Sequence, residues 1–217
     1  MLRSFLLIAL LVAAPAAPAA ERTILVLGDS LSAAYGIPDD AGWVQLLRNR
    51  LSELGVDGEV VNASISGETT RGGLARMPEL LDAERPAVVI IELGGNDGLR
   101  GISPAATEQN LTSMVELAQD QGARVLLVGV RLPPNYGQAF TERFRATFRA
   151  VVEKTGCAYV PKFLENVGGV AGMMQADGIH PTAEAQPRLL ENVWVELEPM
   201  LGMPEKKKKA LATDGHR

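Results

Sequence analysis

Five apolar runs recur along the chain, each as long as a buried strand, and four of them are bordered on at least one side by glycine or proline. The third run is apolar at every position except Glu92, which is typical of a strand that is covered on both faces of a sheet. The predicted strands are Thr23–Leu27, Glu59–Ala63, Ala87–Leu93, Arg124–Val130 and Cys157–Pro161.

Helical periodicity fills the intervals between these runs, at about 43–54, 74–81, 103–122, 140–152 and 182–201. Ser103 and Pro104 favour a helix start there, because serine caps helices and proline suits the first turn. The regular alternation predicts an α/β fold, a three-layer α/β/α sandwich around a five-stranded parallel sheet. We take the strand order 2-1-3-4-5, one of the two common doubly wound orders and the flavodoxin-like one.

The two ends of the chain differ from the middle, which leaves one expected domain at 21–201. Residues 1–20 have the features of a signal peptide: Arg3, an apolar core too short for a membrane span, and small-residue cleavage sites. We therefore expect a periplasmic or secreted protein, with an uncleaved N-terminal anchor as the alternative. Residues 202–217 carry the run Lys206–Lys209 and are expected to form a solvated flexible tail, or else a weak contact with an anionic surface.

Composition narrows the classes of function. A formal charge of -5 and a pI near 5.2 argue against a nucleic-acid partner, which normally selects a basic face. A single cysteine excludes an internal disulfide, and with only two histidines the chain has too few ligands for a closed Cys/His zinc site. A metal site built from carboxylates alone stays open.

Glycine and small polar residues crowd the loops that follow the first three predicted strands. These loops contain Ser30, Gly67 and Asn96. In the order 2-1-3 the carboxyl ends of the three strands are neighbours, which puts Ser30 at the centre of one rim. A serine past a strand end and near the start of a helix has exposed N–H groups beside it, and a developing oxyanion needs such groups.

A serine nucleophile also needs a base, and His180 is the plausible one because His216 lies in the tail. Asp177, three residues earlier, can reach one imidazole nitrogen on a tight turn. The loop must cross three strand spacings, about 14 Å. The twenty or so residues between Pro161 and Pro181 span up to ~60 Å when extended. The geometry therefore permits a Ser–His–Asp triad without proving it.

These segments together resemble the four blocks of the GDSL, or SGNH, hydrolase family. Gly28–Leu31 is similar to the first block, Gly67 to the second-block glycine, Gly94–Asp97 to the GxND block and Asp177–His180 to the DxxH block. The blocks stand in the family order over about 150 residues, with no departure at the block positions. Three further stretches are similar to the bacterial periplasmic thioesterase I/protease I/lysophospholipase (arylesterase) group: Ala63–Gly67, Ile91–Gly101 and Leu132–Gly137.

The resemblance implies a role for each of these residues. Ser30 would be the nucleophile, His180 its base and then acid, and Asp177 the partner of the imidazole. The N–H groups of Ser30 and Gly67 and the amide of Asn96 would hold the oxyanion, with no metal or organic cofactor. Aryl esters, acyl-CoA-type thioesters and lysophospholipids would be hydrolysed through an acyl-Ser30 intermediate. We expect a monomer with at most transient membrane contact.

Other positions carry weaker expectations. Asp29 and Asp97 are expected to hydrogen-bond loop backbone locally. The segment after the fourth strand is a tentative apolar wall for substrate, with ordinary packing as the alternative, at Leu132, Pro133, Pro134 and Tyr136. A carbohydrate O-acetylesterase is a rival function, disfavoured by an aromatic content of 5%, and a non-catalytic domain that binds a lipid or anion is a second rival.

Overall fold

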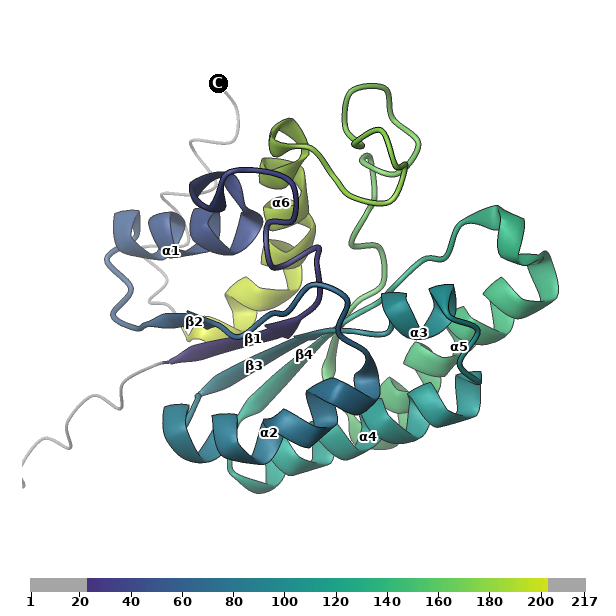
Figure 1. Cartoon of the computed structure of the whole chain (residues 1–217). Coiled ribbons are helices and arrows are strands. Elements are labelled where there is room, and N and C mark those ends of the chain that lie inside the picture. Colours follow the sequence, from purple (N-terminus) through teal and green to yellow (C-terminus); the bar gives the residue numbers. More distant parts are fainter. Residues whose placement is uncertain (1–22, 203–217) are drawn as a thin grey trace, which may run out of the picture.

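A five-stranded parallel sheet lies at the centre of the structure, a computed structural model that describes residues 23–202 (Figure 1). Its strands are β1 (Ile24–Gly28), β2 (Val60–Asn62), β3 (Val88–Glu92), β4 (Arg124–Val128) and β5 (Ala158–Val160). They lie in the order β2-β1-β3-β4-β5, which confirms the predicted order and the α/β class. β1 pairs with β3 along its whole length, while the edge strands β2 and β5 are short.

The two faces of the sheet face two separate hydrophobic clusters. Successive side chains of a strand point to opposite faces. Val26 and Ile90 accordingly join one cluster, and Leu25, Leu27 and Ile91 join the other. All five side chains are fully buried, which explains why the strands read as continuous apolar runs in the sequence.

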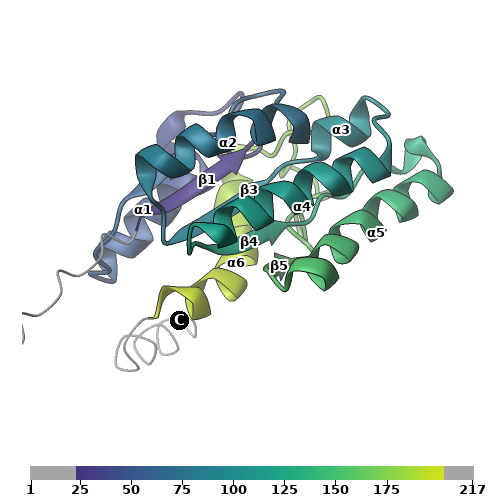
Figure 2. The ribbon, with the colours of Figure 1, turned by 90° about the horizontal axis from the view of Figure 1, so that it is seen from below.

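Helices cover both faces and complete the three layers (Figures 1 and 2). On one face, α1 (Trp43–Glu53) packs against α6 (Gln186–Leu197). On the other, α4 (Pro104–Asp120) lies between α2 (Thr70–Glu84) and α5 (Gln138–Thr155). A short helix, α3 (Gly95–Leu99), follows β3 directly, in a segment whose glycines and polar residues predicted only a loop.

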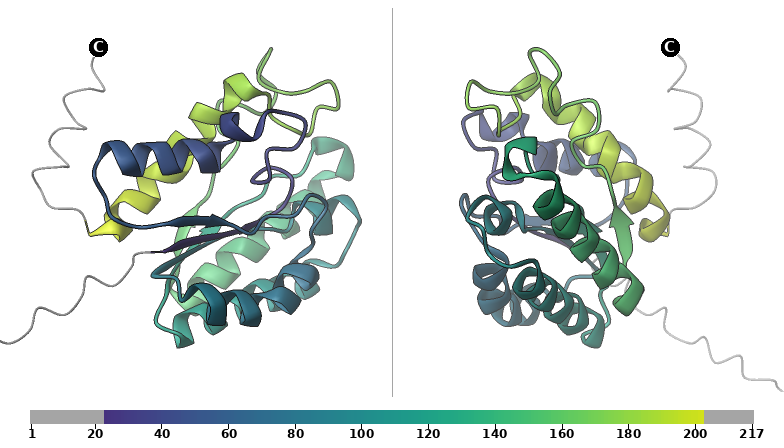
Figure 3. Two further views of the ribbon diagram at one scale, coloured as in Figure 1. Left: turned by 60° about the vertical axis from the view of Figure 1, so that its left-hand side comes forward. Right: turned by 90° about the vertical axis from the view of Figure 1, so that its right-hand side faces the viewer.

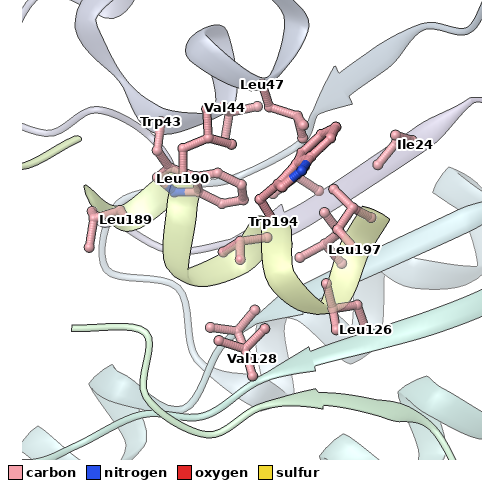
Figure 4. Packing of buried hydrophobic residues seen from close by; sticks show 14 of the residues in the cluster. Ile24, Trp43, Val44, Leu47, Leu126, Val128, Leu189, Leu190, Trp194 and Leu197 are labelled. Atoms are coloured by element: carbon pink, nitrogen blue, oxygen red, sulfur yellow. The ribbon is translucent and has the colours of Figure 1, made fainter. Parts of the chain in front are cut away.

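Large side chains fill the face beneath α1 and α6, where Trp194 lies above Val128 of β4 (Figure 4). The ring of Trp43 meets Phe163 edge-on, with 5.8 Å between their centroids. The backbone N–H of Trp43 donates to Oε1 of Gln186 at 3.0 Å, and this bond joins the first turns of α1 and α6. The start of α6 is therefore fixed to the core just beyond the loop that carries His180.

The helix α2 is longer than the apolar pattern predicted, 70–84 rather than 74–81. Its N-cap is Thr69, whose side-chain oxygen accepts the N–H of Gly72 at 3.3 Å. The first turn holds polar residues and glycines, so that periodicity could not reveal it. The start of α4 is as predicted, with Ser103 as N-cap and Pro104 in the first turn.

A long loop, 161–182, connects β5 to the last helical segment and contains no helix or extended strand. One isolated antiparallel bridge, between Met174 and Pro181, closes its C-terminal part. Figure 3 shows this loop rising beyond the edge of the sheet at which the strands end. It is the segment that carries Asp177 and His180.

The predicted signal peptide and nearly all of the lysine-rich tail lie outside the described residues. The sheet and its two clusters draw on elements from Ile24 to Leu201. Within residues 23–202, no helix has the length and apolar character that crossing a bilayer requires.

Candidate active site

The predicted site residues gather where the strands end. Because β2, β1 and β3 are neighbours, the segments that follow them share one edge of the sheet (Figure 1). Ser30 lies two residues beyond β1, Gly67 lies in the loop between β2 and α2, and Asn96 lies in α3. The loop 161–182 brings Asp177 and His180 to the same edge, where His180 meets Ser30.

Ser30 was expected near the start of a helix, but it opens a run of turns at 30–36, and α1 begins only at Trp43. The carbonyl of Asp29 accepts the N–H of Ala33 at 3.0 Å, and that of Ser30 accepts the N–H of Tyr35 at 3.2 Å. The turn then stops because Gly36 has a φ of 74°, in the left-handed region. A single turn at the strand end thus presents the hydroxyl of Ser30.

A continuous chain of polar contacts runs from Asp177 through His180 to Ser30. Asp177 Oδ2 lies 2.6 Å from His180 Nδ1, and His180 Nε2 lies 2.9 Å from Ser30 Oγ. Asp177 Oδ1 accepts the backbone N–H groups of Ile179 and His180 at 2.9 and 3.0 Å. The side chain of Asp177 is 40% exposed and that of His180 is 17% exposed.

Electrostatics assigns the protons along this chain. The hydrogen bond to the His180 side chain, followed by those to the N–H groups of His180 and Ile179, lowers the pKa of Asp177 to about 2. Asp177 is therefore an ionised acceptor at neutral pH, and Nδ1 of His180 must donate to it. In the neutral imidazole this leaves Nε2 as an acceptor for the hydroxyl of Ser30.

Two backbone N–H groups beside Ser30 are available to a ligand. Among residues 23–202, neither the N–H of Ser30 nor that of Gly67 donates to a protein acceptor. Gly67 has a φ of 81°, and its carbonyl accepts Nη2 of Arg100 at 2.9 Å. Arg100 follows α3 directly, so this bond links the Gly67 loop to the helix that carries Asn96.

The amide of Asn96 is held by Asp29. Asn96 Nδ2 donates to Asp29 Oδ2 at 3.1 Å, which leaves its second N–H without an acceptor among the described residues. Asp29 Oδ1 accepts the N–H of Leu31 at 3.1 Å. Burial raises the pKa of Asp29 to about 6, and the hydrogen bond from Leu31 and the nearby His180 oppose that rise.

Asp29 makes the expected local backbone contact, with Leu31, but Asp29 and Asp97 also make long-range contacts that were not expected. Asp29 binds Asn96, 67 residues away. The fully buried Asp97 accepts the backbone N–H of Thr70 at 2.9 Å and the hydroxyl of Thr107 at 3.3 Å. Its carboxylate therefore joins α2, α3 and α4, and it fixes α3 from beneath.

A second buried carboxyl, Glu92, lies directly behind Asp29. Its Oε2 accepts the hydroxyl of Ser32 at 2.8 Å and the N–H of Asp29 at 3.4 Å. Its Oε1 has no hydrogen-bond partner among the described residues. Burial, and then the negative charge of Asp29, raise the pKa of Glu92 well above its usual range.

The tentative substrate wall is only partly exposed. Leu132 belongs to a hydrophobic cluster and packs so closely on Gly98 that a Cβ there would lie 2.4 Å from it. Pro133 is half-buried, and Pro134 begins a 3₁₀ turn that ends at Tyr136. The hydroxyl of Tyr136 donates to the carbonyl of Leu99 at 3.1 Å. This segment therefore supports α3 from the side.

Sequence reasoning missed four residues that support the site: Tyr35, Glu92, Arg100 and Gln175. Glu92 had a usable signal, because a charged residue within an apolar strand must find a buried partner. The other three contact backbone carbonyls or an imidazole ring, and nothing in their spacing marks such contacts.

Comparison with known proteins identifies relatives over most of the chain. Residues 26–187 match the model of the GDSL-like Lipase/Acylhydrolase family. The chain is 60% identical to Esterase TesA of Pseudomonas aeruginosa over 183 residues, 84% of this chain and 91% of that protein. It is 42% identical to Thioesterase 1/protease 1/lysophospholipase L1 of Escherichia coli K12 over 183 residues, 84% of this chain and 86% of that protein.

Solved structures agree with the fold. The crystal structure of TesA, 60% identical, superposes with a TM-score of 0.81 over 82% of this chain and 99% of the other. The psychrotrophic esterase EstA of Pseudoalteromonas sp., solved inhibited by monoethylphosphonate, is 38% identical with a TM-score of 0.80, over 84% of this chain and 100% of the other. The chain therefore belongs to the GDSL-like lipase/acylhydrolase family and is an ester hydrolase.

Proposed function

We propose that the chain hydrolyses acyl esters and thioesters by nucleophilic catalysis at Ser30. The observation that carries the proposal is the unbroken set of contacts from Asp177 to His180 to Ser30, at 2.6 and 2.9 Å. Ser30 Oγ attacks the acyl carbon while its proton passes to Nε2 of His180. The ionised Asp177 stabilises the resulting imidazolium and holds the ring in one orientation.

The tetrahedral oxyanion that forms is held by three donors, the N–H groups of Ser30 and Gly67 and the free N–H of Asn96. The two backbone N–H groups donate to no other described residue, so no hydrogen bond within the protein has to break when the oxyanion forms. Asp29 fixes the orientation of the Asn96 amide before the reaction. Preorganised donors of this kind act where negative charge develops.

The breakdown of two tetrahedral intermediates, one in acylation and one in deacylation, completes the cycle. In the first, the bond from the acyl carbon to the leaving oxygen or sulfur breaks, and the leaving group takes the proton from Nε2 of His180. This leaves acyl-Ser30. In the second half, His180 takes a proton from water, whose oxygen attacks the acyl carbon. The bond to Ser30 Oγ then breaks, the proton returns to Oγ, and a carboxylic acid is released.

Exposed apolar side chains near Ser30 favour acyl chains as substrates. Tyr35 is 51% exposed, Ile65 48% and Ile179 39%. Ile179 precedes His180, and the ring of Tyr35 lies 4.5 Å from its imidazole, centroid to centroid. The N–H of Ile65 donates to the carbonyl of Gly28, the last residue of β1. Such a surface suits a hydrocarbon chain better than the hydroxyl groups of a glycan.

The relatives support the same substrate class. One is named an esterase and another a thioesterase and lysophospholipase. We therefore propose aryl esters, acyl-CoA-type thioesters and lysophospholipids as the substrates of this chain. A carbohydrate O-acetylesterase remains the rival, and it predicts a sharp preference for acetyl groups.

The proposal is tested by hydrolysis of p-nitrophenyl esters from acetyl to palmitoyl and of acyl-CoA thioesters, with Ser30→Ala alongside. We expect activity to peak beyond acetyl and to vanish in the variant. A p-nitrophenyl alkylphosphonate should phosphonylate Ser30 Oγ of the wild type with release of p-nitrophenol, as read by mass spectrometry of the Ser30 peptide. Activity of Ser30→Ala above a few per cent of wild type would overturn the assignment of the nucleophile.

We also propose that the chain is exported, with residues 1–20 removed, and acts as a monomer. The apolar core and small-residue sites in these residues support cleavage. Fractionation of expressing cells and the intact mass of the product test both parts. A cytoplasmic protein of full-length mass would contradict export, and a dimer in solution would contradict the monomer.

A further inference from the structure

The loop that carries Asp177 and His180 is not fixed to Ser30 by secondary structure. Ser30 and His180 are 150 residues apart in the chain, and residues 161–182 form turns. The bonds from Asp177 to Ile179 and His180 shape the turn from within. They do not determine how far the imidazole lies from Ser30, which depends on what holds the loop 161–182 against the turn that begins at Ser30.

Gln175 joins the two segments with both hydrogens of its side-chain amide. Nε2 donates to the carbonyl of Tyr35 at 2.8 Å and to the carbonyl of Pro181 at 3.0 Å. The backbone N–H of Gln175 donates to the carbonyl of His180 at 2.7 Å. One residue thus joins the turn that begins at Ser30 to the two peptide groups that follow the imidazole.

The partner segment is shaped to receive this amide. Gly36, next to Tyr35, has a φ of 74°, and a Cβ built there would lie 2.5 Å from Oε1 of Gln175. Only glycine allows both the backbone conformation and this close approach. The ring of Tyr35 in turn lies 4.5 Å from the imidazole of His180, tilted by 40°.

We infer that Gln175 is a positioning residue that sets the distance between Ser30 Oγ and His180 Nε2. Within residues 23–202, the Gln175–Tyr35 bond is the only hydrogen bond between segments 29–37 and 173–182 besides the Ser30–His180 contact itself. Gln175 touches no reacting atom and acts through the two segments that it joins. The inference rests on the proposed roles of Ser30 and His180.

Loss of this bond should lower the rate of the chemical step more than the binding of substrate. Misplacement of catalytic groups by about 1 Å can cost on the order of 100-fold in rate. In Gln175→Ala we expect kcat for a p-nitrophenyl ester to fall about 10- to 100-fold. KM should stay within about threefold, because the exposed apolar side chains that face substrate remain. Gln175→Met, which keeps the length but has no donor, should behave in the same way.

A matched control is Gln119→Ala. Gln119 Nε2 donates to the carbonyl of Thr155 at 3.1 Å, joining α4 to the end of α5 at a site remote from Ser30. We expect it to lower the midpoint of urea unfolding about as much as Gln175→Ala does, with kcat unchanged. A shared loss of stability with different effects on kcat separates positioning from general destabilisation.

Proton NMR supplies a readout that a merely structural role would not give. The proton on Nδ1 of His180 is held by Asp177 within the turn, so its downfield signal should persist in Gln175→Ala. Wild-type kcat in Gln175→Ala and Gln175→Met would overturn the inference. So would loss of the Nδ1 signal together with activity, because that result means that the turn has unfolded. An active Ser30→Ala would instead refute the proposed function itself.

Discussion

Replacing Glu92 by glutamine tests whether the carboxyl behind the site is neutral in the folded protein. Glu92 is fully buried, Ser32 and Asp29 donate to one of its oxygens, and the other oxygen has no partner among the described residues. Burial raises its pKa, and the charge of Asp29 raises it further. Glutamine keeps the shape and the acceptor for Ser32 and removes the titration.

The sign of the pH effect follows from proton binding. Between an ordinary glutamate pKa of about 4.3 and the raised pKa of the folded state, the folded protein holds a proton that the unfolded chain has released. The unfolding free energy of the wild type must therefore fall as the pH rises through this window, by up to about 1.4 kcal/mol per pH unit. Glu92→Gln lacks this loss, so its stability relative to wild type should rise by about 1–3 kcal/mol from pH 5 to 7.

Urea unfolding followed by the fluorescence of the buried Trp43 and Trp194 measures these free energies at pH 5, 6, 7 and 8. An offset that does not depend on pH is expected as well, because the new amide lacks a partner for its N–H groups. The slope against pH is therefore the quantity to compare. The exposed Glu79→Gln serves as the control and should run parallel to wild type. Parallel curves for Glu92→Gln would show that Glu92 is ionised when folded and would refute the reasoning.

Three further results are expected. Asn96→Ala should lower kcat by ~10²–10³ through the loss of one oxyanion donor, and an unchanged kcat would make Asn96 structural. Asp177→Asn should lower kcat by about 10⁴, because the amide no longer fixes the imidazole proton. Leu132→Ala should cost about 2–5 kcal/mol in unfolding free energy as a core truncation; unchanged stability with a raised KM for long-chain esters would instead restore it as a substrate contact.

The fold followed from the sequence wherever burial imposed a pattern over several residues. The strands are buried on both faces, which requires apolar residues at nearly every position, and the sheet order then follows from a common topology. Patterning failed where the elements are short or polar. α3 has five residues, and the first turn of α2 is held by the cap at Thr69, so neither has an apolar period to detect.

Recognition of the site depended on scarcity and on sequence blocks. His180 is the predicted base because the other histidine, His216, lies in the tail, and Asp177 is its predicted partner because it lies three residues before His180. The residues that hold Asp177 and His180 in place have no comparable signal in the sequence. Gln175 reaches a backbone carbonyl 140 residues away, and any residue at position 35 supplies that carbonyl. Such contacts depend on where the chain passes, which residue types do not encode.

Among the carboxyls at this edge of the sheet, Asp177, Asp29 and Glu92 differ in burial, and this difference separates their pKa values. Asp177 is exposed and accepts three hydrogen bonds, so its pKa falls and it stays charged beside the imidazole. Asp29 and Glu92 are buried, so their pKa values rise, and each carries less negative charge near neutral pH than an exposed acid would. A full negative charge on both would lie behind the oxyanion donors and would oppose the oxyanion that they hold. Its own hydrogen bonds therefore keep the negative charge on Asp177, where the imidazolium forms, while burial reduces the charge on the acids behind the oxyanion donors.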